Sequence, residues 1–226
     1  MINRVAYFGL MFNGIKLVIY DLDGVLIDSN KAILESFKRT FEEIGEPFEP
    51  EMILSRIGYG MYHILDEILG SEYEDRHEEI RQRYIKHFQS LDISYIELLD
   101  EVPETLREIH GLGYLQSVAT NKTVTEAERI LSELGVAGYF DLMAGFMTVD
   151  KPKPEPDMIL YSLEKLGVDP GEAVFVDDTS VGLTAGIRAG VHTVGITTGN
   201  NTLEQIMSVS PVTVINRFSD IPRLLN

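Results

Sequence analysis

Four short clusters of acidic, hydroxyl, amide and lysine side chains could together act on a phosphate ester. Carboxylate oxygens without cysteine or suitably spaced histidine are the hard donors that Mg²⁺ prefers. Hydroxyl, amide and lysine donors could hold a phosphate dianion against that cation. An aspartate there can attack phosphorus, and a second carboxylate two residues later can transfer the proton. The clusters are Asp21 and Asp23; Thr120, Asn121 and Lys122; Lys151 and Lys153; Asp177 and Asp178.

The segments before these clusters predict strands, which explains how residues so distant in the sequence can meet. The runs 16–20, 114–119, 139–144 and 173–176 are largely apolar, as in strands buried within a parallel sheet. Ligands of open α/β sheets bind beyond the carboxyl ends of the strands. We therefore expect the four clusters to converge at one edge of one sheet.

Predicted strands and helices alternate from residue 103 onwards, which indicates an α/β fold with a doubly wound parallel sheet. The stretch 30–89 differs, because its apolar residues recur at helical spacing and it contains no convincing strand. We interpret it as a helical insertion after the first strand, and Ser29 before it as a helix cap. The predicted division is a core domain of residues 1–29 and 100–226 and an inserted domain of residues 30–99.

Composition limits the partners of the chain and its compartment. Among 226 residues, 19 are basic and 36 acidic, and this net charge of -17 would repel nucleic-acid phosphates. No apolar run approaches the ~18 residues of a membrane span. The absence of cysteine excludes disulfides and fits a reducing compartment, so we expect a cytoplasmic protein without nucleic-acid or membrane partners. The apolar segment 5–12 lacks a cleavage site, and we interpret it as a short strand or a tail rather than a secretory signal.

The clusters resemble the four motifs of a known family, the haloacid dehalogenase superfamily of phosphohydrolases. DLDGVLIDS at 21–29 resembles the first motif, and SVATNK at 117–122 resembles the second. KPEP at 153–156 and VFVDDTS at 174–180 resemble the third and the fourth. The predicted insertion resembles the small α-helical cap of this family, whose core is Rossmann-like. Within it, RIGYG at 56–60 resembles the substrate loop of phosphoglycolate phosphatase-like members.

For the acidic residues, the resemblance implies a magnesium-assisted nucleophile. Asp21 would be the nucleophile and a Mg²⁺ ligand, and Asp23 the acid–base group with its backbone carbonyl on the metal. Asp178 would hold Mg²⁺, with Asp177 a direct or an outer-shell partner. Many members carry another aspartate where this chain has Gly182, whereas the Asp177–Asp178 pair resembles an acidic-pair variant common near β-phosphoglucomutase. Which of the two aspartates contacts the metal therefore stays open.

For the other core residues, the resemblance implies binding of the transferring phosphoryl group. Thr120 and Asn121 would bind it, and Lys153 would neutralise it and orient the nucleophile. Lys153 fits this role better than Lys151, because only Lys153 has a helix-ending glycine at the distance seen in the family. Lys122 either helps to bind phosphate or only marks the start of a helix.

The cap is the expected source of substrate choice, because the core clusters suffice only for a phosphoryl group. Two chain segments connect it to the core, and this arrangement suits a lid that closes over substrate. Its one glycine-rich break contains Gly58, where backbone can approach a ligand closely, and Tyr59 beside it. Arg56 either pairs with a substrate carboxylate, which would favour phosphoglycolate, or faces solvent.

Three functions follow from these residues. The first is a magnesium-dependent phosphatase that hydrolyses a small phosphorylated metabolite, such as phosphoglycolate, through an aspartyl-phosphate. The second is a sugar-phosphate mutase of the β-phosphoglucomutase type, which would protect that intermediate from water. The third is a catalytically silent binding or regulatory module. A dehalogenase is disfavoured, because Asp23 and the acidic fourth motif suit metal and phosphate chemistry, and a homodimer is left open.

Overall fold

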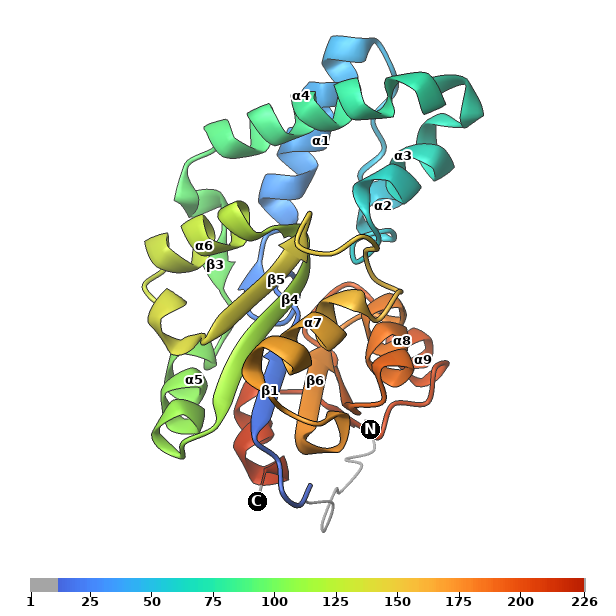
Figure 1. Ribbon diagram of the computed structural model, residues 1–226. Coiled ribbons are helices and arrows are strands. Elements are labelled where there is room, and N and C mark those ends of the chain that lie inside the picture. Colours follow the sequence, from blue (N-terminus) through green and yellow to red (C-terminus); the bar gives the residue numbers. More distant parts are fainter. Residues whose placement is uncertain (1–11, 226) are drawn as a thin grey trace, which may run out of the picture.

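A six-stranded parallel sheet forms the centre of the molecule (Figure 1). The computed structural model describes residues 12–225, so most of the predicted N-terminal strand or tail at residues 5–12 lies outside the described residues. The strand order is β5-β4-β1-β6-β7-β8, and every neighbouring pair is parallel. The strands are β1 (Leu17–Tyr20), β4 (Leu115–Thr123), β5 (Leu142–Phe146), β6 (Ala173–Asp177), β7 (His192–Ile196) and β8 (Thr213–Ile215).

Helices cover both faces of the sheet, because successive side chains of each strand point to opposite sides. Val18 and Tyr20 belong to the buried cluster that includes residues of α5 (Val102–Gly111), α6 (Val124–Glu133) and the C-terminal 3₁₀ helix η5 (Phe218–Leu224). Leu17 and Ile19 instead pack with residues of α7 (Asp157–Leu166) and α8 (Ser180–Ala189). A short helix, α9 (Leu203–Met207), precedes β8. This arrangement confirms the predicted doubly wound α/β fold.

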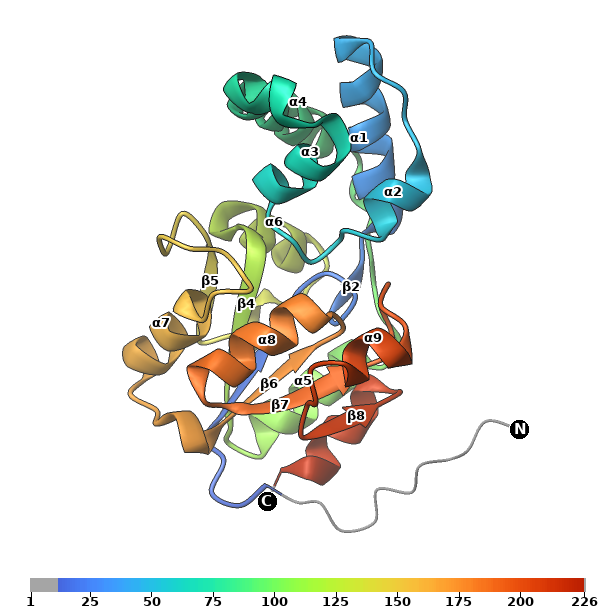
Figure 2. The ribbon, with the colours of Figure 1, turned by 90° about the vertical axis from the view of Figure 1, so that its right-hand side faces the viewer.

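Four helices from residues 30–90 form a helical layer above the carboxyl edge of the sheet (Figures 1 and 2). Phe37 and Phe41 pack with Tyr84 and Phe88 in its interior. The amphipathic pattern over residues 71–88 predicts one long helix, which is wrong at its start, because residues 71–76 form a 3₁₀ segment, η1 (Ser71–Arg76), and the α-helix begins at His77. No helix among residues 12–225 is long and apolar enough to cross a membrane. The helices of the layer are α1 (Asn30–Ile44), α2 (Pro50–Leu54), α3 (Met61–Leu69) and α4 (His77–Ser90).

Two short strands that the sequence pattern did not predict join the helical layer to the core. β2 (Ile27–Asp28) and β3 (Glu97–Leu98) pair in antiparallel fashion. Strands of two residues show no periodicity, so neither could be recognised from the sequence. They lie in the two predicted segments that connect the core to the insertion. The division into domains 1–29 with 100–226 and 30–99 stays a prediction.

Candidate active site

The strand register places the acidic and hydroxyl clusters at the same edge of the sheet. Tyr20 of β1 pairs with Val118 of β4 and with Val176 of β6, so the residues that follow them are neighbours. Asp21 continues this alignment, since its backbone N–H donates to the Val176 carbonyl at 3.0 Å. Strand β4 was expected to end at residue 119 but runs to residue 123, across an irregularity in its pairing with β5. Thr120, Asn121 and Lys122 therefore lie in the last part of the strand rather than after it.

Lys153 lies between two carboxylates at this edge of the sheet. Its Nζ is 2.7 Å from Asp21 Oδ1 and 3.0 Å from Asp177 Oδ2, and the side chain is fully buried. Burial alone would lower the pKa of Lys153, but Asp177 and Asp21 raise it above its usual value, so the amine stays charged. Lys151 is exposed, and no ion pair is found for it among residues 12–225. The structure thus brings Lys153, and not Lys151, to the predicted nucleophile.

Asp21, Asp177 and Asp178 form a buried carboxylate cluster whose oxygens suit a divalent cation. Each residue offers an oxygen within 4.8 Å of the others. The pKa of Asp21 is raised from 3.8 to about 7, because burial, and to a smaller extent Asp177 and Asp23, outweigh the lowering effect of Lys153. The pKa of Asp178 is raised well above its usual value by burial, with Asp177 and Asp21 adding to the shift. A bound cation would offset this concentration of negative charge, and carboxylate oxygens are the donors that Mg²⁺ prefers.

The two aspartates of the fourth motif differ in their hydrogen bonds. Asp178 Oδ2 accepts a hydrogen bond from the Asn200 backbone N–H at 3.1 Å, while its Oδ1 is buried and has no protein partner. Asp177 Oδ2 accepts from Lys153, and its Oδ1 accepts from the backbone N–H and hydroxyl of Thr179 at 2.8 and 2.7 Å. The free oxygen of Asp178 favours it as a direct metal ligand. The occupied oxygens of Asp177 favour an outer-shell position.

Two glycines permit this close arrangement. Gly24 has a positive φ of 80°, and a Cβ built on it would lie 2.6 Å from Asp178 Oδ2. A Cβ on Gly182 would overlap the carboxylate of Asp177. Asp177 and a side chain at position 182 therefore exclude each other, which gives a steric reason for the departure from the fourth motif.

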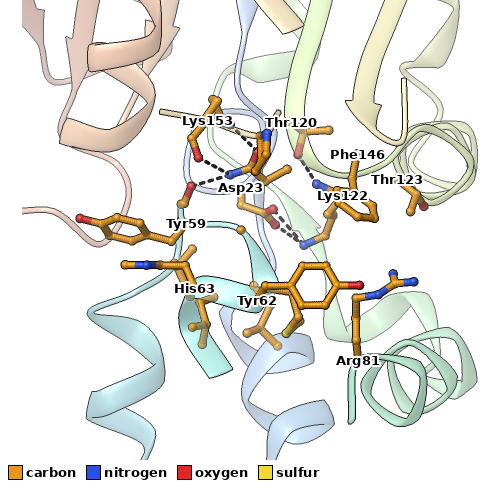
Figure 3. A pocket seen from close by; sticks show the side chains of 18 of the residues that line it. Asp23, Tyr59, Tyr62, His63, Arg81, Thr120, Lys122, Thr123, Phe146 and Lys153 are labelled. Carbon is orange, nitrogen blue, oxygen red and sulfur yellow. Dashed lines mark hydrogen bonds and ion pairs between the residues drawn. The ribbon is translucent and has the colours of Figure 1, made fainter. Parts of the chain in front are cut away.

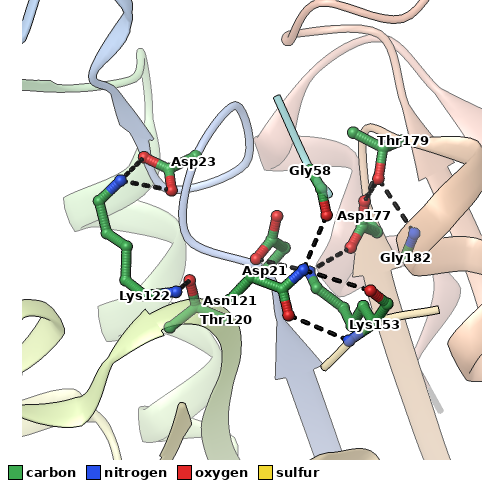
Figure 4. A network of polar contacts seen from close by, with 10 residues as sticks. All are labelled: Asp21, Asp23, Gly58, Thr120, Asn121, Lys122, Lys153, Asp177, Thr179 and Gly182. Atoms are coloured by element: carbon green, nitrogen blue, oxygen red, sulfur yellow. Dashed lines mark hydrogen bonds and ion pairs between the residues drawn. The ribbon is translucent and has the colours of Figure 1, made fainter. Parts of the chain in front are cut away.

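Asp23 has a separate set of partners on the other side of Asp21 (Figure 4). Lys122 Nζ donates to both of its carboxylate oxygens at 2.9 Å, and the Ser29 hydroxyl donates to Oδ1. Burial would lower the pKa of Lys122, but Asp23 and Glu126 raise it above its usual value. Ser29 precedes α1 but makes no side-chain cap, so its interpretation as a helix cap was wrong. Lys122 and Ser29 instead orient the carboxylate of Asp23.

Asn121 connects three parts of the chain through its amide, as Figure 4 shows. Its Nδ2 donates to the Gly58 carbonyl at 2.9 Å and to the Lys153 carbonyl at 3.4 Å. Its Oδ1 accepts from the Lys153 backbone N–H at 3.0 Å. Thr120, which is buried, and Asn121 both line the cavity, and the phosphoryl contact expected of them stays a prediction.

The loop of residues 56–60 reaches the core, but only part of it faces the site. Gly58 has a φ of 105°, and a Cβ on it would lie 2.7 Å from Thr179 Cγ2. Tyr59 stacks on His63 at 4.4 Å between ring centroids, and both line the cavity. Arg56 points elsewhere, since its Nε is 2.7 Å from Glu67 and its Nη1 donates to the Met52 carbonyl. Its position gives no support to the predicted pairing with a substrate carboxylate.

A cavity of about 500 Å³ lies between the helical layer and the sheet edge (Figure 3). Its core side carries Asp21, Asp23, Thr120, Lys122 and Lys153, which the sequence predicted. Most of its lining is nevertheless apolar, and several of these wall residues carried no motif signal. The wall includes Ile33, Phe37, Ile57, Tyr62, Arg81, Tyr84, Ile85, Glu126 and Phe146.

Comparisons with known proteins agree with this geometry. Residues 18–196 match the model of the haloacid dehalogenase-like hydrolase family. The chain is 32% identical over 212 residues to the phosphoglycolate phosphatase of Aquifex aeolicus, covering 93% of this chain and 97% of that protein. It is 28% identical to pyrophosphatase PpaX of Bacillus velezensis, covering 92% and 94% of the two chains. A haloacid dehalogenase-like hydrolase of Streptococcus pneumoniae has the same fold, with a TM-score of 0.83, 22% identity and coverage of 93% and 98%.

Proposed function

Because the chain belongs to the haloacid dehalogenase-like hydrolase family, whose relatives include phosphatases, we propose that it is a magnesium-dependent phosphatase of small phosphomonoesters. Under this proposal the phosphoryl group passes through a covalent intermediate on Asp21. The observation that carries the proposal is the position of Asp21, which lines the cavity and is paired with a buried lysine.

In the first step, an Asp21 oxygen forms a bond to phosphorus while the bond between phosphorus and the ester oxygen breaks. Lys153 favours the ionised form of Asp21, because its Nζ is 2.7 Å from that carboxylate. Asp23, in its protonated form, would give its proton to the departing alcohol. Thr120 would donate its hydroxyl to an oxygen of the transferring phosphoryl group.

In the second step, Asp23 would accept a proton from water as the water oxygen attacks the phosphorus of the aspartyl-phosphate. The bond to Asp21 then breaks, and inorganic phosphate and the free carboxylate are regenerated. Lys122 and Ser29 position Asp23 for both transfers, because both donate to its carboxylate. Proton transfer of this kind contributes about 10²–10⁴-fold to rates.

Asp21, Asp178 and the Asp23 backbone carbonyl would hold Mg²⁺, with Asp177 in an outer-shell position. The fit is supported by the buried, unpartnered oxygen of Asp178 and by the charge of the carboxylate cluster. When bound, Mg²⁺ supplies positive charge that lets a phosphate dianion approach the carboxylates.

The deciding experiment is a panel of phosphate compounds assayed with Mg²⁺, with EDTA, and with Mg²⁺ restored after EDTA. Phosphoglycolate, pyrophosphate and p-nitrophenyl phosphate cover the named relatives and a general ester. We expect release of inorganic phosphate only when Mg²⁺ is present. Interconversion of glucose phosphates with a bisphosphate primer would favour the mutase, and the absence of all turnover would favour a binding module.

A further inference from the structure

The cavity is larger and less polar than a phosphoryl group requires. Beyond Asp21 and Asp23, its wall is formed by aromatic and aliphatic side chains such as Phe37, Tyr62 and Phe146. Arg81 lines this part, but its Nε and Nη2 are paired with Glu78 at 2.8 and 2.9 Å. Its positive charge is thereby paired with a carboxylate, and the guanidinium also lies over the Phe146 ring. This wall suits an organic group with an apolar body rather than a second phosphate.

One polar side chain in this wall has no partner of its own. Glu126 lies in the first turn of α6, is only 9% exposed, and lines the cavity. Its side-chain oxygens accept no hydrogen bond and form no ion pair among residues 12–225, while Thr123 caps its backbone N–H. Burial raises the pKa of Glu126; Lys122 lowers it and Asp23 raises it. Lys122 is already bound to both oxygens of Asp23.

A second polar group lines the same cavity. Tyr84 of α4 is buried and lines the cavity, and no hydrogen bond is found for its hydroxyl within the described part of the chain. Burial raises its pKa, and the charges of Glu126 and Asp23 raise it further. Tyr84 and Glu126 thus bring two polar groups without protein partners in the described residues to the lining of the same cavity.

We propose that Glu126 selects the substrate by accepting a hydrogen bond from an amine or ammonium group on the alcohol part. The preferred substrate is then a phosphomonoester whose alcohol combines an apolar or aromatic body with such a donor. A buried carboxylate without a partner is unfavourable, and a bound donor removes that penalty. A carboxylate in the same place would be repelled. This inference rests on the proposed phosphatase function and names the substrate class of the same site.

The test uses three para-substituted phenyl phosphates with closely similar phenol leaving groups. Their substituents are ethyl, 2-aminoethyl and 2-carboxyethyl. With Mg²⁺ present, we expect kcat/KM to be highest for the aminoethyl ester and lowest for the carboxyethyl ester. Charge-assisted hydrogen bonds favour the aminoethyl over the ethyl ester by about tenfold or more.

Glu126→Gln keeps the shape of the side chain but removes its charge, so the aminoethyl-to-ethyl ratio should fall about tenfold, mainly through KM. Glu128→Gln is the matched control, because Glu128 is exposed on the same helix, and it should keep the wild-type ratio. Equal rates for the three esters in the wild type, or a ratio unchanged by Glu126→Gln, would overturn the inference and leave the phosphatase proposal intact. Absence of Mg²⁺-dependent turnover of every ester would overturn both. The wild-type ranking also decides the matter if Glu126→Gln does not fold.

Discussion

Replacement of Lys153 by methionine tests the electrostatic argument for the active site. Lys153 is fully buried and contacts Asp21 at 2.7 Å and Asp177 at 3.0 Å, with Asp178 in the same cluster. Removing one partner of a buried ion pair costs about 3–5 kcal/mol of unfolding free energy. Because two carboxylates lose their cation at once, we expect the metal-free variant to lie near the upper end of that range. Added Mg²⁺ should stabilise this variant more than the wild type, since it restores positive charge.

The sign of the pH dependence follows from the pKa of Asp21. In the wild type this pKa is raised from 3.8 to about 7, so the folded protein holds more protons than the unfolded chain between these values. The stability contributed by Asp21 therefore falls as pH rises through this window. Lys153 lowers the pKa of Asp21, so its removal raises that pKa further. The fall in stability should then extend to higher pH. The acid limb of the pH profile of kcat/KM should also shift to higher pH.

Urea unfolding in EDTA at several pH values measures the free energy of unfolding. Steady-state kinetics with Mg²⁺ measures kcat/KM. We expect Lys153→Met to lower kcat/KM by about 10²–10³-fold, as for the loss of other preorganised charges. Lys151→Met is the matched control. It should change the free energy of unfolding by no more than about 0.5 kcal/mol, because Lys151 is exposed. Normal rates and stability in Lys153→Met, together with an inactive Lys151→Met, would refute the assignment.

Four further results are expected. Asp21→Asn should remain folded by circular dichroism but release no phosphate, because an amide cannot act as the attacking carboxylate; substantial turnover by this variant would exclude a covalent intermediate on Asp21. EDTA should abolish phosphate release and Mg²⁺ restore it, with Ca²⁺ a poor substitute because its coordination is looser; full activity in a chelated sample would contradict the metal requirement. Tyr59→Ala should change relative rates across a substrate panel more than the rate on p-nitrophenyl phosphate, whereas uniform losses would remove the loop from substrate choice. Asn121→Ala should lower kcat on every ester, because it removes the hydrogen bonds to the Gly58 and Lys153 backbones; an effect confined to large substrates would argue against this role.

Local patterns were sufficient to predict most elements of the fold. Apolar spacing predicts helices over 61–69 and 157–166, each followed by a glycine, and a strand over 192–196, and α3, α7 and β7 have these bounds. The convergence of the four clusters was also predictable, because parallel strands bring their carboxyl ends to one edge. The 3₁₀ segment η1 and the strand pair β2–β3 could not be predicted, since each is too short to show a period and depends on how the helical layer meets the core.

The partner that each polar side chain takes was far less predictable than its approximate place. Arg56 and Arg81 both lie in the helical layer, and only the second lines the cavity. Their difference comes from acidic neighbours, since Glu67 holds the first and Glu78 the second. Glu126 belongs to no motif, and in the sequence it is one glutamate of an ordinary helix. Its burial becomes visible only when the helical layer is placed over the sheet edge, because Glu126 of α6 and Tyr84 of α4 line the same cavity.

The contacts of Gly58 link the position of the helical layer to the chemistry at the sheet edge. Its carbonyl is bound by Asn121, whose side-chain oxygen in turn holds the backbone of Lys153. Its Cα packs against Thr179, which donates two hydrogen bonds to Asp177, and Asp177 pairs with the amine of the same lysine. The 56–60 loop is thereby connected to the backbone of Lys153 through Asn121, and to its amine through Thr179 and Asp177. One glycine of the helical layer is therefore linked by two chains of contacts to the lysine that pairs with Asp21.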